Sequence, residues 1–199
     1  LARGPCLLGE DRPLALDQDG TWQLDTLALL DFEDQREACR YGTAPTNRVV
    51  RGTAPAGQYT GVKFVLGVPF ELNHIDVAEA PAPLDEITLF WGWAHGYSFF
   101  NAITSSLPGD PGPDAYPNVY IFQLTSQGCE GDPLRGEVVS CTHPFRPEVT
   151  LTGFDPEASA IAVDLAELLR DAPLVTGRSC TSALLSEECR APFAALAFK

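Results

Sequence analysis

The sequence predicts an all-β fold, an antiparallel β-sandwich with long loops, one short helix and disulfide staples. Segments rich in β-branched and aromatic residues recur with turn signals at intervals of roughly ten residues, as is typical of a sandwich. The 17 glycines and 17 prolines are spread over 199 residues without forming repeats, which indicates a globular chain. The six cysteines lie at long, irregular spacings with no Cys-x-x-Cys pair. We therefore expect disulfides rather than a zinc site, within a single domain over residues 1–199.

The first half of the chain contains three predicted strands. Residues 26–33 (TLALLDFE) are mostly apolar and are bounded by acidic turns. Residues 58–68 (QYTGVKFVLGV) alternate with a period near two, and the proline that follows cannot continue a central ladder. This strand should therefore end at an edge or a bend. Residues 86–100 (EITLFWGWAHGYSFF) carry the densest strand signal, because β-branched and aromatic residues are many and helix formers are few.

The second half contains two further predicted strands, a hairpin and a helix. A turn-rich loop at 107–117 precedes a strand at 118–125 (NVYIFQLT). Residues 129–141 look like a hairpin whose ends a disulfide can close, with an Asp-Pro pair in its turn. Residues 148–154 (EVTLTGF) alternate as a strand does. Residues 164–170 (DLAELLR) predict the helix, because their first aspartate can cap it and the leucines follow helical spacing.

Charge and composition exclude several classes of partner. The formal net charge is −14, and a polyanion of this strength repels the phosphates of nucleic acids and the surface of an anionic membrane. No apolar run approaches the ~18 residues that a membrane span needs. The chain contains no methionine, initiator included, and starts without the basic and apolar regions of a signal peptide. We therefore expect that any signal peptide has been removed, and that the disulfides place the protein in the periplasm or at the cell surface.

Catalytic motifs are lacking, so the chain is expected not to be an enzyme. The sequence has no Gly-x-Ser-x-Gly elbow, phosphate-binding loop, GxGxxG or HExxH motif. Asp31 and Glu33 would share one face of a strand, as the two carboxylates of a glycosidase could. In a chain with 27 acidic residues, such pairs arise by chance and usually face solvent.

Three histidines are the candidate metal ligands: His74, His95 and His143. His74 and His143 fall in constrained loops that we expect near the surface. In an extended strand Trp91, Trp93 and His95 would project from one face as a row, because side chains alternate. The glycines within this segment would then leave the opposite face bare for close approach of another backbone. The alternative is that both indoles are packing aromatics and that the histidines are solvated.

Several blocks of residues are specific enough to compare with known families. They are residues 28–33 with Cys39, 59–64 (YTGVKF), 66–74 (LGVPFELNH), 83–84, 90–99 (FWGWAHGYSF), 128–129, Cys141, 151–155 (LTGFD), 163–165, 179–180 and Cys189. In this order they resemble the MbnP-like family of periplasmic copper-binding proteins, which carry a WxW motif. This family is also described as the four-cysteine partner of a metallo-mystery pair, and the resemblance covers most of the chain.

The resemblance implies a β-rich periplasmic protein whose copper site depends on oxidation of a tryptophan to kynurenine. The oxidation is carried out by a partner of the MbnH type, a di-haem enzyme related to cytochrome c peroxidases. An indole N–H offers a metal no lone pair, whereas kynurenine carries an amine and a ketone. In a related group of copper proteins the modified tryptophan and a ligand histidine form a Trp-x-His pair, which Trp93 and His95 match. The resemblance thus implies Trp93 or Trp91 as the residue oxidised. His74 and His95 are then the first imidazole ligands and His143 the third, because imidazole suits copper.

Departures from the family pattern motivate a second hypothesis. Gln123 stands where the family often has a histidine, and Thr181 stands where it commonly has a methionine. His95 or His143 would have to replace these ligands. The alternative function is a disulfide-stapled surface interaction module that has lost the metal site.

The cysteines follow the family pattern in part. The resemblance implies the disulfides Cys129–Cys141 and Cys180–Cys189. We expect part of the N-terminal family segment to be missing from this chain, which leaves the pairing of Cys6 and Cys39 open. A lipid anchor upstream of this chain is compatible with the family.

Overall fold

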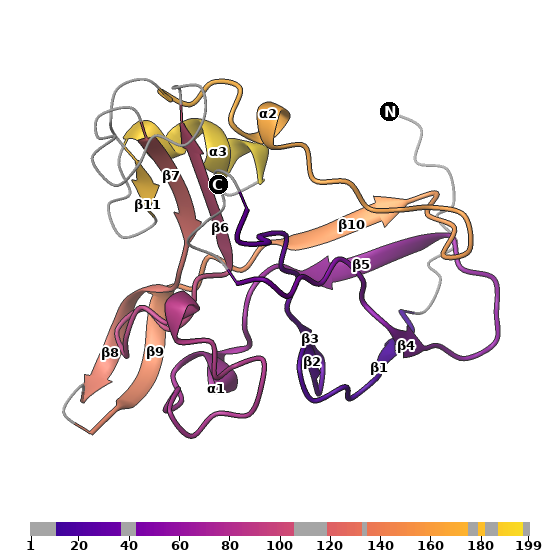
Figure 1. The fold of residues 1–199 in the computed structure, drawn as a ribbon, viewed down its shortest axis with the longest axis horizontal. Helices are drawn as coiled ribbons and strands as arrows, with labels where there is room; N and C mark the ends of the chain where they lie inside the picture. The colour runs from indigo at the N-terminus through magenta and orange to yellow at the C-terminus, as the bar shows by residue number, and fades with distance from the viewer. Residues whose placement is uncertain are drawn as a thin grey trace, which may run out of the picture.

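A computed structural model describes residues 11–36, 43–105, 119–132, 135–174, 179–181 and 187–196 (Figure 1). The fold is all-β, as predicted. Its strands are β1 (Ala15–Leu16), β2 (Gln23–Leu24), β3 (Leu27–Ala28), β4 (Gly52–Thr53), β5 (Gly61–Val65), β6 (Phe100–Ser105), β7 (Val119–Leu124), β8 (Gln127–Asp132), β9 (Glu137–His143), β10 (Glu148–Thr152) and β11 (Cys180–Thr181). Cys6, Cys39 and the expected loop at 107–117 lie outside the described residues.

Within the described ranges the helices are α1 (Phe70–Asn73), α2 (Leu165–Leu168) and α3 (Arg190–Ala195), with single 3₁₀ turns at Ile87–Leu89 and Glu187–Cys189. The predicted helix at 164–170 is α2, and the side chain of Asp164 accepts a hydrogen bond from the backbone N–H of Glu167 as its N-cap. The other two helices were not predicted from the sequence. No helix in these parts of the chain is both long and apolar enough to cross a membrane.

The described strands form several small sheets. Antiparallel pairs join β1 with β4, β2 with β3, β5 with β10, and β8 with β9, while β6, β7 and β11 form a three-stranded sheet. In that sheet β6 and β7 are antiparallel, whereas β11 runs parallel to β7. The chain leaves β7 and enters β8 after only Thr125 and Ser126, so the β8–β9 hairpin extends directly from this sheet, with α1 beside it (Figure 1).

The main apolar core lies on β7. Its buried residues are Tyr120, Phe122, Leu124, Leu168, Leu169, Cys180 and Cys189. Burial of both faces explains why β7 is almost continuously apolar. A second cluster contains Val68, Leu84 and Tyr97, and it supports the loops between β5 and β6.

Three predicted strands are present with shorter ends, and the predicted hairpin is present with slightly longer ones. The segment 58–68 contains β5, 118–125 contains β7, 129–141 contains most of the β8–β9 hairpin, and 148–154 contains β10. The disulfide Cys129–Cys141 closes that hairpin, and Cys180–Cys189 is formed as well. Asp132 is the last residue of β8, and the proline after it lies outside the described residues.

The strand predicted at 26–33 is mostly wrong. Only Leu27 and Ala28 form a strand there, and Asp31 makes an isolated bridge with Asn47. The backbone N–H of Glu33 donates to the Asp31 carboxylate at 3.0 Å. Because this side-chain acceptor competes with a sheet ladder, the segment turns instead of extending. The two acids therefore do not share a strand face.

The strand predicted at 86–100 is wrong except for its last residue. The segment contains the 3₁₀ turn Ile87–Leu89, and Glu86 accepts a hydrogen bond from the backbone of Thr88 at its start. A turn then runs from Phe90 to Tyr97, which pair as an isolated antiparallel bridge. Gly92 and Gly96 have φ values of +94° and +68°, so they bend the chain where strand residues would extend it.

Candidate metal centre

The turn between Phe90 and Tyr97 separates the two tryptophans that a strand would have aligned. Trp91 is 55% exposed. Trp93 is half-buried, and its ring meets that of Phe90 edge-on with centroids 6.0 Å apart. Its indole also packs against Gly136 at the tip of the β8–β9 hairpin, where a Cβ would lie 2.8 Å from the indole carbons. The predicted row of two indoles and an imidazole is therefore absent from this turn.

Asn73, the last residue of α1, organises the centre of the site. Its side chain is 1% exposed, and its Oδ1 accepts the backbone N–H of Tyr97 at 2.9 Å. Because that N–H can only donate, the Asn73 amide nitrogen faces the other way. It donates to Ser126 Oγ at 3.2 Å and to His74 Nε2 at 3.1 Å. Gly96 lies against this amide, and a Cβ there would come within 2.2 Å of Asn73 Nδ2.

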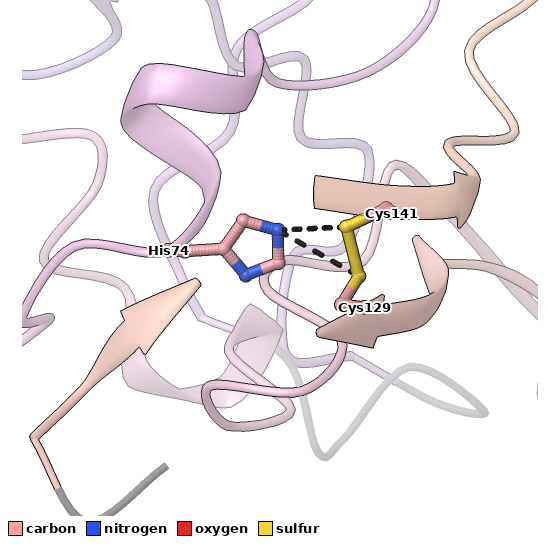
Figure 2. A group of neighbouring side chains, drawn as sticks. All are labelled: His74, Cys129 and Cys141. Atoms are coloured by element: carbon pink, nitrogen blue, oxygen red, sulfur yellow. Dashed lines mark hydrogen bonds between the residues drawn. A yellow bond between two sulfur atoms is a disulfide. The ribbon is translucent and has the colours of Figure 1, made fainter. Parts of the chain in front are cut away.

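His74 is buried, with 8% of its surface exposed, so the prediction of a surface loop is wrong. Its Nδ1 lies 2.8 Å from the carbonyl oxygen of Trp93. A carbonyl only accepts, so Nδ1 carries the proton and Nε2 presents a lone pair. Nε2 points at the hairpin disulfide, 3.3 Å from Cys141 Sγ and 3.9 Å from Cys129 Sγ (Figure 2).

The surroundings of His74 favour its neutral form. Burial lowers the pKa of the imidazole, the hydrogen bond to the Trp93 carbonyl opposes that effect, and the charge of His95 lowers the pKa further. A neutral imidazole is the form that binds metal ions. The Trp93 carbonyl acts on it as an outer-shell partner, which fixes the tautomer and the ring orientation.

The other two histidines occupy different positions. His95 is half-buried in the turn, and its Nδ1 lies 3.4 Å from the carbonyl oxygen of Ser126. Because Ser126 also accepts from Asn73, one residue connects His95 with the surroundings of His74. His143 is exposed at the end of β9, and its ring stacks on Phe145 with centroids 5.6 Å apart. The structure thus brings two of the three predicted ligands into one polar cluster.

Sequence reasoning missed Asn73 and Ser126. Asn73 precedes His74 directly, but an asparagine at a helix end usually serves as a local cap. Ser126 carries no signal of its own, since its contact with Asn73 spans 53 residues. Gln123 and Thr181, where the sequence departs from the family pattern, are register partners of β7 and β11. Both departures therefore fall at one place in the sheet, and Gln123 is only 2% exposed there.

One group of potential metal donors stands out among the described residues. One donor atom each from His74, Cys129 and Cys141 lies within 4.8 Å of the others. The two sulfurs form a disulfide, and a metal requires thiolates. While the disulfide is intact, His74 is the one member of this described group that can bind a metal ion, and Ser126 links its surroundings to a second imidazole, that of His95.

Comparison with known proteins agrees with this fold. The sequence model of the MbnP family matches residues 14–182. Among solved structures, the chain is similar to "MbnP from Methylosinus trichosporium", with 32% sequence identity and a TM-score of 0.75, over 94% of this chain and 70% of that one. Among curated protein sequences, none matches significantly. The family model covers most of the chain, and the structural match covers nearly the whole of this chain. The chain therefore belongs to the MbnP family.

Proposed function

We propose that this protein binds copper in the periplasm or at the cell surface, through His74 and His95. The observation that carries the proposal is the buried, neutral His74, whose Nε2 lone pair is fixed by the hydrogen bond from Nδ1 to the Trp93 carbonyl. Imidazole nitrogen is a good copper ligand. The choice of copper as the metal rests on membership of the MbnP family, whose resemblance implies a copper-binding protein. Binding through Nε2 replaces the Asn73 hydrogen bond, and Asn73 Nδ2 keeps its bond to Ser126.

The third ligand is proposed to come from a tryptophan oxidised by a di-haem partner enzyme. With two molecules of hydrogen peroxide as the oxidant, the partner would add two oxygen atoms across the pyrrole C2–C3 bond and release two waters. Hydrolysis with a further water then removes one carbon as formate to leave kynurenine. Trp93 is the favoured residue, because its own carbonyl holds His74 and it lies two positions from His95. Trp91 is more exposed and is the better relay for electrons that leave towards a docked haem. The net charge of −14 favours a partner with a basic docking surface.

Copper titration tests the ligand assignment. Protein co-produced with the partner enzyme, with its disulfides intact, is titrated with Cu(I) against a chromogenic Cu(I) chelator. His74→Ala and His95→Ala should each weaken binding by more than about tenfold, whereas His143→Ala, which removes an exposed imidazole, serves as the matched control. Equal binding by His74→Ala and wild type would remove His74 from the site.

Mass spectrometry tests the modification. Peptides that cover residues 90–97 are compared between protein made with and without the partner enzyme. The exchange of one carbon for one oxygen is expected on Trp93, only in the presence of the partner, and Trp93→Phe should abolish both the modification and high-affinity copper binding. If both indoles stay intact beside an active partner, the modified-tryptophan site is wrong for this protein.

The second candidate function is a surface interaction module without a metal. The pairing of Gln123 with Thr181 favours it, because neither amide nor hydroxyl replaces the soft or nitrogen ligands of the family pattern. This alternative predicts that the chain binds no copper in any form, processed or unprocessed.

A further inference from the structure

His74 contacts the hairpin disulfide through the atom that carries its lone pair. Nε2 lies 3.3 Å from one sulfur and 3.9 Å from the other, and Figure 2 shows the ring edge facing the S–S bond. The second disulfide has a different neighbour, because Cys189 Sγ lies 3.8 Å from the backbone carbonyl of Thr181. A role of Cys129–Cys141 as a structural cross-link does not by itself explain why an imidazole nitrogen lies beside it.

The hairpin would hold both sulfurs in place after reduction. Cys129 and Cys141 are direct register partners of β8 and β9, with Cα atoms 3.8 Å apart. The ladder continues on both sides of this pair, from Gln127↔His143 to Asp132↔Glu137. Cleavage of the S–S bond therefore leaves two thiols on neighbouring positions of the same sheet face. Both cysteines are half-buried rather than enclosed in the core, so a small dithiol can reach them.

We propose that reduction of Cys129–Cys141 opens a second copper site, in which two thiolates and His74 Nε2 bind Cu(I). A dithiol reductant gives two electrons and two protons to the disulfide and becomes a disulfide itself. Cu(I) then displaces the two thiol protons, and its own oxidation state does not change. Thiolates are soft ligands that select Cu(I), and imidazole is compatible with them. The disulfide is thus a switch that determines whether this site exists.

The residues around His74 suit this role. The Trp93 carbonyl oxygen lies 2.8 Å from His74 Nδ1 and keeps that nitrogen protonated. This hydrogen bond fixes the ring so that Nε2 faces the sulfurs. Asn73 loses one hydrogen bond when Nε2 binds the ion, but its bonds to Ser126 and to the Tyr97 N–H remain. The proposal depends on the proposed function only for the presence of copper, since it requires no modified tryptophan.

The experiment uses the full chain produced without any partner enzyme, with intact indoles verified by mass. One sample is kept oxidised, and the other is reduced with dithiothreitol and desalted without oxygen. Both are titrated with Cu(I) against a chromogenic chelator, while the ultraviolet thiolate-to-copper charge-transfer absorption is recorded. The reduced protein should take up one more Cu(I) than the oxidised protein and show the absorption, and the oxidised protein should not show it.

Variants assign the extra ion to the three donors. Cys129→Ser with Cys141→Ser keeps the other four cysteines, so it reports any copper that those bind after reduction. This double variant should lose the additional ion, and His74→Ala should weaken its binding by more than about tenfold. Should the double variant fail to fold, the reduced wild type is alkylated with iodoacetamide, which blocks these two thiols together with every other accessible one. Alkylation must then abolish the additional uptake, and uptake that survives it would exclude thiolate ligands.

Two results would overturn the proposal. The first is equal uptake by reduced wild type and the double variant, and the second is unchanged affinity in His74→Ala. Failure of the proposed function gives a different result, because the oxidised, partner-processed protein would then bind no copper while the reduced protein still gains its thiolate absorption.

Discussion

The two disulfides that the structure describes cross-link similar lengths of chain in different surroundings. Their sequence separations are 12 for Cys129–Cys141 and 9 for Cys180–Cys189. Loop entropy alone gives each about 2.5 to 3 kcal/mol. Cys180 and Cys189 are 0% and 2% exposed within the apolar cluster on β7, whereas the other pair is half-buried beside an imidazole. The comparison teaches that the surroundings of a disulfide, and not the length of chain that it cross-links, determine whether it is purely structural or can react.

The largest loss in the free energy of unfolding is expected from variants that remove one disulfide at a time. Cys180→Ala with Cys189→Ala should cost about 4 to 5 kcal/mol, because loss of the cross-link adds to a cavity in the core. Cys129→Ala with Cys141→Ala should cost about 2 to 3 kcal/mol, since the hairpin ladder remains and little core is lost. Denaturant unfolding at pH 7 measures both. The comparison fails if the hairpin variant is as unstable as the core variant.

The next largest effect is expected from a glycine substitution, which tests whether the polar region around His74 is packed as tightly as the core. Gly96→Ala places a Cβ within 2.2 Å of Asn73 Nδ2 at a φ of +68°, so the amide that holds His74 must move. Gly92→Ala is the matched control, because it has a φ of +94° and nothing lies within 4 Å of its Cβ.

Strain alone should cost Gly92→Ala about 1 to 2 kcal/mol. Gly96→Ala should cost about 2 to 4 kcal/mol, because the displaced Asn73 leaves buried polar groups without partners. Both values come from chemical denaturation, and the tautomer of His74 can be followed by nitrogen chemical shifts. Equal losses in the two variants would mean that the cluster tolerates displacement of Asn73.

The sequence predicted the parts of the fold that depend on local pattern. Segments 118–125 and 148–154 form strands because their β-branched and aromatic residues favour extension without a competing turn. The segment 86–100 has the same composition, but two glycines with positive φ convert it into a turn. The histidines are ligand candidates by residue type, and the family resemblance is what ranks His74 and His95 first. The burial of His74 and the roles of Asn73 and Ser126 were not predictable, since they arise from contacts between residues 19 to 53 positions apart.

The smallest expected effect is a pH dependence that belongs to the His74 region and not to the core. Burial, the first cause, and the charge of His95 lower the pKa of His74 in the folded protein, while the Trp93 carbonyl opposes them. In the unfolded chain the imidazole titrates near its ordinary pKa of about 6.5. The unfolded state therefore binds more protons between these two pKa values, so the free energy of unfolding rises with pH there.

The stabilising contribution of neutral His74 is complete above pH ~6.5 and decreases as the pH falls towards the folded-state pKa. Because one full proton corresponds to a slope of about 1.4 kcal/mol per pH unit, the expected slope is a fraction of that value. Urea unfolding of the metal-free, oxidised protein between pH 8 and 5 measures it. His74→Gln should reduce the loss of stability at acidic pH, and His143→Gln exchanges an exposed imidazole in the same way as a control. An unchanged pH profile in His74→Gln would show that folding does not lower the pKa of His74, and the contrast between the two disulfides would then rest on sulfur burial alone.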